Sequence, residues 1–333
     1  MKSIWTKTAA LPAFSVLEGH QQADVAVIGG GLAGMLTAAA LWREGAEVVV
    51  VEADRIGGGQ TAGTTAKLTA QHGLKYHQLI QTLGAEAAGQ YARANLAAVE
   101  RLRQLVREWS IECDFQDCTS FLYAVGAPGP LEEEHDACLA LGMDVFLTRD
   151  TELPFAAQAL GLRNQACFHP LRLLAALAEG LTVYEHSRVL TVEEHALSTE
   201  RGSVSAERIV FACHYPFINM PGYYFPRQHQ ERSYVLALKG TKNLQNYYLG
   251  IDGEGLSFRS WGDMCRSTAP MITLEPPRPS RAPPMPHIRP VIPPGRSSRA
   301  ADAIRASPPS AAAASRIGFS FFMSLPPRTE ISP

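Results

Sequence analysis

The sequence predicts an α/β fold built on a βαβ unit with a parallel sheet. Three observations support this prediction: an apolar run over 24–28, a GGGLAG turn directly after it, and a second apolar run, AEVVVVE, over 46–52. Continuous apolar strands are typical of parallel sheets that are covered on both faces. With 333 residues, 46% of them hydrophobic, the chain is long enough for one large domain or two ordinary ones.

Further helices and strands are predicted along the rest of the chain. Apolar residues at helical spacing over 32–43 predict the helix that connects the two strands. Residues 85–109 predict a long amphipathic helix, and residues 169–180 predict a shorter one that ends at Gly180. Short apolar runs predict further strands over 121–125, 181–185, 188–193, 208–212, 234–238 and 256–260.

The glycine turn fits the G-x-G-x-x-G pattern of a dinucleotide site, with Gly29, Gly31 and Gly34 between a strand and a helix. The first glycine allows the tight turn, the second lets the backbone approach a pyrophosphate, and the third allows close packing of helix and strand. Glu52 ends the second strand, where its carboxylate can accept hydrogen bonds from ribose hydroxyls and disfavours a 2′-phosphate. The pattern alone leaves NAD and FAD open.

The segment after Glu52 favours FAD. Residues 52–79 contain three consecutive glycines and several threonines, among them Thr64 and Thr65, in a hydroxyl-rich loop suited to the phosphates and ring of a flavin. Several long stretches together resemble the FAD-dependent oxidoreductases of the D-amino-acid oxidase or glycine oxidase type. They are VIGGGLAGM, EADRIG with TTAKLTAQHGL, FHPLRLLAALA, IVFACHYPFINMPGYYFPRQHQERSYVLAL and YLGIDGEGLSFRSWGDM.

The resemblance covers residues 4 to about 264 and is strongest to a bacterial branch that often carries a Rieske iron–sulfur domain. It implies a Rossmann-like FAD-binding domain over 22–85 and 150–219, interleaved with a β-rich substrate domain over 86–149 and 220–264. It also implies that the three glycines hold the pyrophosphate, Glu52 the ribose, Thr64 and Thr65 the loop beside the flavin, and the Val189 backbone the adenine. The implied reaction is oxidation of an amine or amino acid by hydride transfer to FAD, with oxygen or a carrier as electron acceptor.

Substrate-binding residues are hard to identify from the sequence, because in flavin-dependent amine oxidation the protein mainly orients and desolvates the substrate. Arg232, Tyr234 and Arg259 lie on strands expected in the substrate domain, and an Arg fork with a Tyr hydroxyl suits a carboxylate. Each has the alternative interpretation of a surface or structural residue. His72 in the TAQHGL loop, and His214 and Tyr215 after the 208–212 strand, are further candidates with the same alternative.

Residues 265–333 change character abruptly. They contain fifteen of the 23 prolines, nine Arg, no Lys and three acidic residues, and they lack periodicity, so we expect a disordered tail. A genuine Pro/Arg-rich tail, a different domain and a shift of reading frame near Met264 or Cys265 are three explanations, and we favour the frameshift. It predicts that a single-nucleotide correction near codon 264 restores a glycine-rich strand and a further βα unit. The alternative to an enzyme is an inactive remnant or an interaction protein that uses this tail.

Several classes of protein are disfavoured by what the sequence lacks. The six cysteines form no C-x-x-C pair or Cys/His cluster, so neither a metal site nor a disulfide framework is expected. The paired C-x-H and C-x-x-H motifs of a Rieske cluster are not present together. The scattered cysteines make a reducing cytoplasm the simplest compartment, and no apolar run is long enough to span a bilayer. Neither a membrane nor a nucleic-acid partner is expected.

Overall fold

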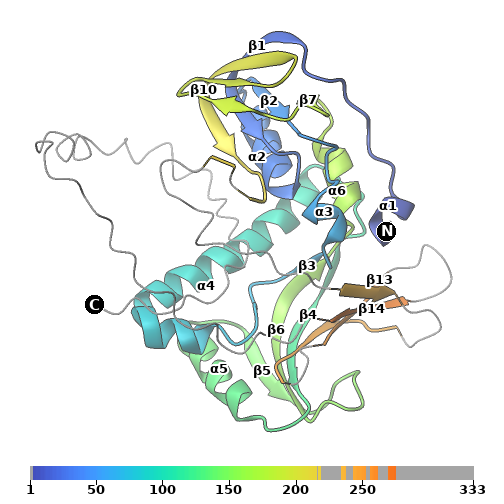
Figure 1. The fold of residues 1–333 in the computed structure, drawn as a ribbon. Helices are drawn as coiled ribbons and strands as arrows, with labels where there is room; N and C mark the ends of the chain where they lie inside the picture. Colours follow the sequence, from blue (N-terminus) through green and yellow to red (C-terminus); the bar gives the residue numbers. More distant parts are fainter. Residues whose placement is uncertain are drawn as a thin grey trace, which may run out of the picture.

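The computed structural model describes residues 3–215, 217–218, 234–237, 243–252, 256–261 and 269–274. This part contains two β-sheets, joined by the long helix α4 (Tyr76–Glu108), which runs from the second sheet to the first (Figure 1). The C-terminal part of α4 packs into the core of the first sheet through Leu102, Leu105 and Val106, whereas Tyr76 and Ala92 belong to the core of the second sheet. None of the helices in these ranges has the length and apolar character needed to cross a membrane.

The first sheet has six strands in the order β7-β2-β1-β10-β9-β8. Its centre is parallel: β1 (Gly19–Ile28) lies between β2 (Val48–Val51) and β10 (Gly202–Phe211), and β2 also pairs with β7 (Thr182–Tyr184). The short strands β8 (Thr191–Val192) and β9 (Ala196–Ser198) add an antiparallel edge. Helices α2 (Leu32–Arg43) and α6 (Pro170–Leu177) pack in the same core as β1 and β2, so the predicted βαβ unit is confirmed.

The second sheet has eight strands and is mainly antiparallel. Along it the order is β11-β14-β13-β12-β4-β6-β3, and β5 also pairs with β6. The bounds are β3 (Lys67–Leu68), β4 (Gln116–Ala124), β5 (Val145–Thr148), β6 (Gln158–Cys167), β11 (Tyr234–Ala237), β12 (Tyr247–Gly250), β13 (Ser257–Trp261) and β14 (Ala269–Leu274). Helix α5 (Gly129–Ala140) packs beside α4 and contributes Leu131 and Cys138 to the core.

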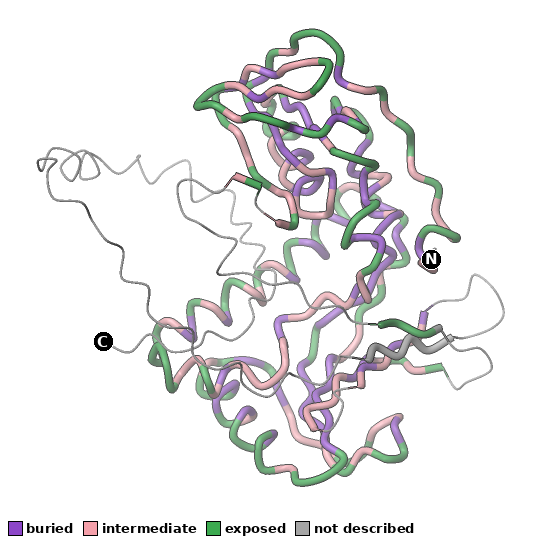
Figure 2. The backbone as a smooth tube through the Cα atoms, viewed as in Figure 1, coloured by how far each residue is buried: buried purple, intermediate pink, exposed green. Residues whose placement is uncertain are grey.

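The buried residues lie mainly in the strands of the two sheets and in the helices that pack against them (Figure 2). All four residues of β2 are buried, as the continuous valine run predicts for a strand that is covered on both faces. A smaller cluster packs the N-terminal helix α1 (Ile4–Thr8) against the rest of the molecule through Trp5, Leu171 and Trp261. Helix α3 (Gln60–Gly63) follows β2 and brings Thr61 beside the glycine turn.

The structure corrects the expected boundary at residue 150. Strand β6 lies within 150–219, yet it pairs with β4 in the middle of the second sheet. The chain returns to the first sheet's core only with α6, so the change of sheet falls after Cys167. The predicted helix over 85–109 begins earlier, at Tyr76, and is interrupted at Gly84, where φ is +81°.

The expected disordered tail is corrected over six residues. Strand β14 lies within 265–333 and pairs antiparallel with both β13 and β11. Its sequence, APMITL, contains two β-branched residues, and the backbone hydrogen bonds of two neighbouring strands stabilise it despite the surrounding prolines. The rest of the tail expectation lies outside the described residues.

Candidate functional site

The glycine turn joins β1 to α2 where the carboxyl ends of β1, β2 and β10 meet. Gly29 has a φ of +112°, and a Cβ atom there would lie 2.8 Å from the Ala212 carbonyl oxygen at the end of β10. A Cβ atom on Gly34 would lie 1.9 Å from the Gly29 carbonyl oxygen. The packing of the protein itself therefore requires the first and third glycines of the motif.

The second glycine of the motif is not required by packing. Gly31 has a φ of −81°. A Cβ atom added to Gly31 would lie 3.4 Å from its nearest neighbour, the Thr61 hydroxyl oxygen, which is an ordinary contact distance. That hydroxyl accepts a hydrogen bond from the Leu32 amide at 3.1 Å, while the amides of Gly31 and Ala33 meet no acceptor within the described ranges. Free amides and a positive helix end favour an anionic group, and the missing side chain leaves room for it.

Glu52 lies directly beside this turn. One of its carboxylate oxygens accepts the Gly30 amide at 2.6 Å, and the other accepts the Asp54 amide at 2.9 Å. A Cβ atom on Gly30 would lie 2.8 Å from Ile56 Cγ2, so the loop after β2 closes against the glycine turn. The half-buried carboxylate is thus held at the carboxyl end of β2, and its ribose-binding role stays a prediction.

A second carboxylate, which the sequence analysis did not identify, holds the loop that follows β2. Glu185 is buried after β7, and its oxygens accept the amides of Ile56 at 2.9 Å and Phe14 at 3.1 Å. The Arg55 guanidinium lies 3.4 Å away. Glu185 thereby connects the N-terminal segment to the loop that follows Glu52.

Val189 lies two residues after Ser187, whose amide donates to the Glu52 carbonyl oxygen at 2.9 Å. Its side chain is buried in the core of the first sheet, whereas its backbone forms no hydrogen bond with any residue that the structure describes. Buried backbone groups usually have partners, so a ligand that pairs with this backbone would satisfy it. This position is compatible with the role that the family resemblance implies.

The Thr64–Thr65 loop is held by its carbonyl groups. The Trp5 indole donates to the Thr64 carbonyl oxygen at 2.8 Å, and the Thr64 hydroxyl accepts the Ala66 amide at 3.1 Å. Arg259 donates from Nη1 to the carbonyl oxygens of Thr65 at 2.5 Å and Ala66 at 2.8 Å. The loop is therefore braced from both α1 and β13.

The two substrate-site candidates that the structure describes, Tyr234 and Arg259, differ in burial. Arg259 is 3% exposed, and its guanidinium donates to the backbone of the loop, which is the structural role stated as the alternative. Tyr234 is 60% exposed on β11. Arg232 lies outside the described residues.

The remaining candidates also have ordinary surroundings. The His72 ring faces α4, with Nε2 3.3 Å from Asn95 Oδ1 and an edge contact to Tyr91, and burial lowers the pKa of His72. His214 is exposed and Tyr215 is half-buried just beyond β10, close in the chain to Ala212. Within the described ranges, no three His, Cys, Asp or Glu side chains gather as a possible metal site.

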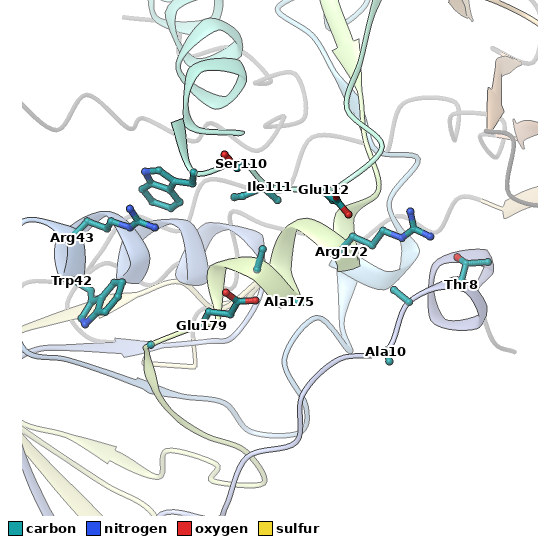
Figure 3. A pocket seen from close by; sticks show the side chains of 14 residues that line it. Thr8, Ala10, Trp42, Arg43, Ser110, Ile111, Glu112, Arg172, Ala175 and Glu179 are labelled. Carbon is teal, nitrogen blue, oxygen red and sulfur yellow. The ribbon is translucent and has the colours of Figure 1, made fainter. Parts of the chain in front are cut away.

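A cavity of about 710 Å³ lies at the opposite end of α2 (Figure 3). Its lining includes Trp42, Arg43, Trp109, Arg172 and Glu179. Because α2 has 12 residues, the two ends of this helix are about 18 Å apart. The cavity is therefore separate from the glycine turn.

The parallel sheet, the glycine turn at a helix N-terminus and the acid that ends β2 define the class of dinucleotide-binding α/β proteins. Comparison with known proteins narrows this class. Residues 24–308 match the model of the family "FAD dependent oxidoreductase" (DAO), and the chain belongs to this family. The match extends beyond Met264 into the Pro/Arg-rich segment, and the frameshift remains a prediction.

Individual relatives agree with this family. The chain is 34% identical over 271 residues to a putative Rieske 2Fe-2S iron-sulfur protein, YhfW, of Bacillus subtilis (strain 168), covering 78% of this chain and 53% of that protein. It is 24% identical over 215 residues to gamma-glutamylputrescine oxidoreductase of Escherichia coli (strain K12), covering 60% and 50%. The chain thus spans about half the length of these curated relatives.

Solved structures show the same fold. Glycine oxidase from Geobacillus kaustophilus superposes with a TM-score of 0.60 at 16% identity, covering 79% of this chain and 74% of that one. The family and the fold expected from the sequence, with FAD as the cofactor of the family, are confirmed. The site roles of individual residues stay predictions.

Proposed function

We propose that this chain binds FAD at the glycine turn and oxidises an amine or amino acid. One observation at Gly31 carries the proposal. The packing of the protein would allow a side chain at this position, yet the residue is glycine, and the amides of Gly31 and Ala33 meet no acceptor within the described ranges. Gly29, Gly31 and Gly34 would let the pyrophosphate approach the start of α2. The bound cofactor would supply a two-electron acceptor for the hydride that leaves the substrate.

The other site residues have positioning roles in this proposal. Glu52 would accept hydrogen bonds from the ribose hydroxyls, and the Val189 backbone would pair with the adenine. Thr64 and Thr65 would lie beside the flavin, in a loop whose carbonyl groups are held by Trp5 and Arg259. The proposed cofactor domain comprises the first sheet with its helices, and the second sheet would bind substrate.

The substrate class follows from the relatives named above, one a glycine oxidase and one a gamma-glutamylputrescine oxidoreductase. An amino acid or a small amine is therefore proposed, with oxygen or a carrier accepting the electrons. A cytoplasmic location is also proposed, because five described cysteines are unpaired thiols.

The test begins with the absorbance spectrum of the purified full chain, with added FAD if the preparation is colourless. A flavin spectrum that bleaches when glycine or gamma-glutamylputrescine is added without oxygen would support the proposal. A colourless protein that takes up no FAD would support the alternative, an inactive remnant or an interaction protein that uses the Pro/Arg-rich segment.

A further inference from the structure

Two cysteines meet on one face of the second sheet. Cys118 lies on β4 opposite Gln165, and Cys167 ends β6 opposite Gln116, so the two cysteines are diagonal neighbours across an antiparallel pair. Residues at such positions point to the same face. The register shifts just after Cys118, and irregularities of this kind increase the local twist of a strand.

The two thiols interact directly and lie near two cations. The thiols of Cys118 and Cys167 lie close enough to act on each other electrostatically, and the charges of Arg259 and Lys67 act on Cys167. Lys67 is directly opposite Cys167 in the pairing of β3 with β6. The neighbouring Cys118 thiol and the two cations lower the pKa of Cys167 to about 6 against the effect of burial, while the pKa of Cys118 is raised.

Such a pair combines a nucleophile with a resolving thiol. A thiolate is the reactive form of cysteine, and redox-active cysteines are found near cations with a second thiol in reach. Cys113 and Cys138 are buried, as Cys167 is, but at these two positions burial is the largest effect and raises the pKa of both thiols, to about 12 for Cys113.

We propose that Cys118 and Cys167 form a reversible disulfide when the protein meets hydrogen peroxide. The Cys167 thiolate attacks the O–O bond, which gives a Cys167 sulfenic acid and, after uptake of a proton, one water. The Cys118 sulfur then attacks the Cys167 sulfur, the S–S bond forms, and the hydroxyl group leaves with the Cys118 proton as a second water. Two thiols lose two electrons, and one peroxide is reduced to two waters.

The diagonal placement favours a bond that is easily reduced again. Diagonal strand positions lie roughly 7 to 8 Å apart, wider than the usual Cα spacing of a disulfide, so the backbone has to shift for the bond to form, and a strained disulfide is more readily reduced. Because Arg259 also donates to the carbonyl groups of Thr65 and Ala66, oxidation removes an anion from beside the residue that braces this loop.

The experiment uses the full chain as purified and needs no bound FAD, so its result is independent of the proposed function. The protein is treated with a small excess of hydrogen peroxide, the remaining thiols are blocked with iodoacetamide, and the digest is mapped by mass spectrometry. We expect a peptide that links Cys118 to Cys167 and disappears on treatment with dithiothreitol. At pH 7 without peroxide, iodoacetamide should modify Cys167 faster than Cys113 or Cys138.

Variants separate the two roles. In Cys118→Ser, the sulfenic acid on Cys167 should persist and be trapped by dimedone, whereas the matched control Cys138→Ser should still form the 118–167 link. The proposal is overturned if the wild-type chain keeps both thiols open to alkylation after peroxide, or if Cys167 is oxidised to a sulfinic acid without the link. Since the wild-type map alone decides between these outcomes, a variant that fails to fold leaves the test intact.

Discussion

The guanidinium of Arg259 lies 2.8 Å from the carbonyl oxygen of Ala66, a contact between residues 193 positions apart. Ala66 has a φ of +51°, a conformation that is uncommon for a residue with a Cβ atom. The same guanidinium nitrogen reaches the Thr65 carbonyl oxygen at 2.5 Å. Strand β13 therefore stabilises the shape of the loop that is proposed to lie beside the flavin.

Replacing Arg259 with Gln should destabilise the protein. The shorter amide cannot reach both carbonyl groups, and the loss of charged hydrogen bonds in a buried site should lower the free energy of unfolding by about 2 to 4 kcal/mol. Urea denaturation measures this, with Arg163→Gln as the control. Arg163 is half exposed in an ion pair with Asp144, so its loss should cost less than about 1 kcal/mol. Equal effects for the two variants would contradict the bracing role.

Gly31→Ala should weaken FAD binding while leaving the stability of the fold nearly unchanged. The added methyl meets only the Thr61 hydroxyl at 3.4 Å, so the free energy of unfolding should stay within about 0.5 kcal/mol of wild type. The same methyl occupies the space proposed for the pyrophosphate and should weaken FAD binding by about 1 to 3 kcal/mol. FAD titration measures the affinity. The control is Gly63→Ala, where an added Cβ atom meets nothing within 4 Å, and unchanged affinity in Gly31→Ala would remove the proposed site.

Glu52→Ala should weaken FAD retention by about 1.5 to 3 kcal/mol, the range for a hydrogen bond to a charged group. The same change also removes the acceptor of the Gly30 and Asp54 amides, so the free energy of unfolding must be measured in the absence of FAD as well. Asp54→Ala is the control, since its carboxylate is 79% exposed. If a folded Glu52→Ala variant binds FAD as tightly as wild type, the ribose-binding role is wrong.

His169 should make stability depend on pH. The fully buried ring caps α6, with Nδ1 accepting the Arg172 amide at 3.3 Å and Nε2 3.0 Å from the Thr8 hydroxyl. Burial, with the nearby charge of Arg172, lowers the pKa of His169 to about 4. The unfolded chain, with an ordinary histidine pKa of about 6.5, takes up a proton first as the pH falls. Stability from this group is therefore present above about pH 6.5 and is lost toward pH 4.

Asparagine can cap a helix without titrating, so His169→Asn isolates this effect. Between pH 7 and pH 5, the wild-type free energy of unfolding should fall by about 2 kcal/mol more than that of the variant. Urea denaturation at both pH values measures the difference. The exposed His195 provides the control, because His195→Asn should keep the wild-type pH dependence.

The first sheet and its glycine turn could be predicted because their signals are local. The apolar runs at β1 and β2, the glycine turn and Glu52 all lie within residues 24–52, where strand, turn and helix follow one another. Spacing in the sequence also placed Glu52 at the end of its strand, where the structure has it beside Gly30.

The second sheet was harder to predict, because its order depends on contacts between distant residues. Strand β6 alternates poorly and contains Gly161, and only its pairing with β4 reveals it as a central strand. The roles of Glu185 and Arg259 have the same origin, since their partners are backbone groups more than one hundred residues away. A backbone amide or carbonyl group is present at almost every residue, so the sequence does not indicate which one binds a given side chain.

The parallel pairing of β1 with β10 also has a consequence for synthesis on the ribosome. Gly19 pairs with Gly202, so β1 cannot form this pairing until the ribosome has synthesised the 183 residues that follow Gly19. At ordinary translation rates this delay is roughly 10 to 40 s. During that time the apolar face of β1 can be covered only by β2, α2 or a chaperone, so mutations that slow elongation in this interval should favour aggregation of nascent chains.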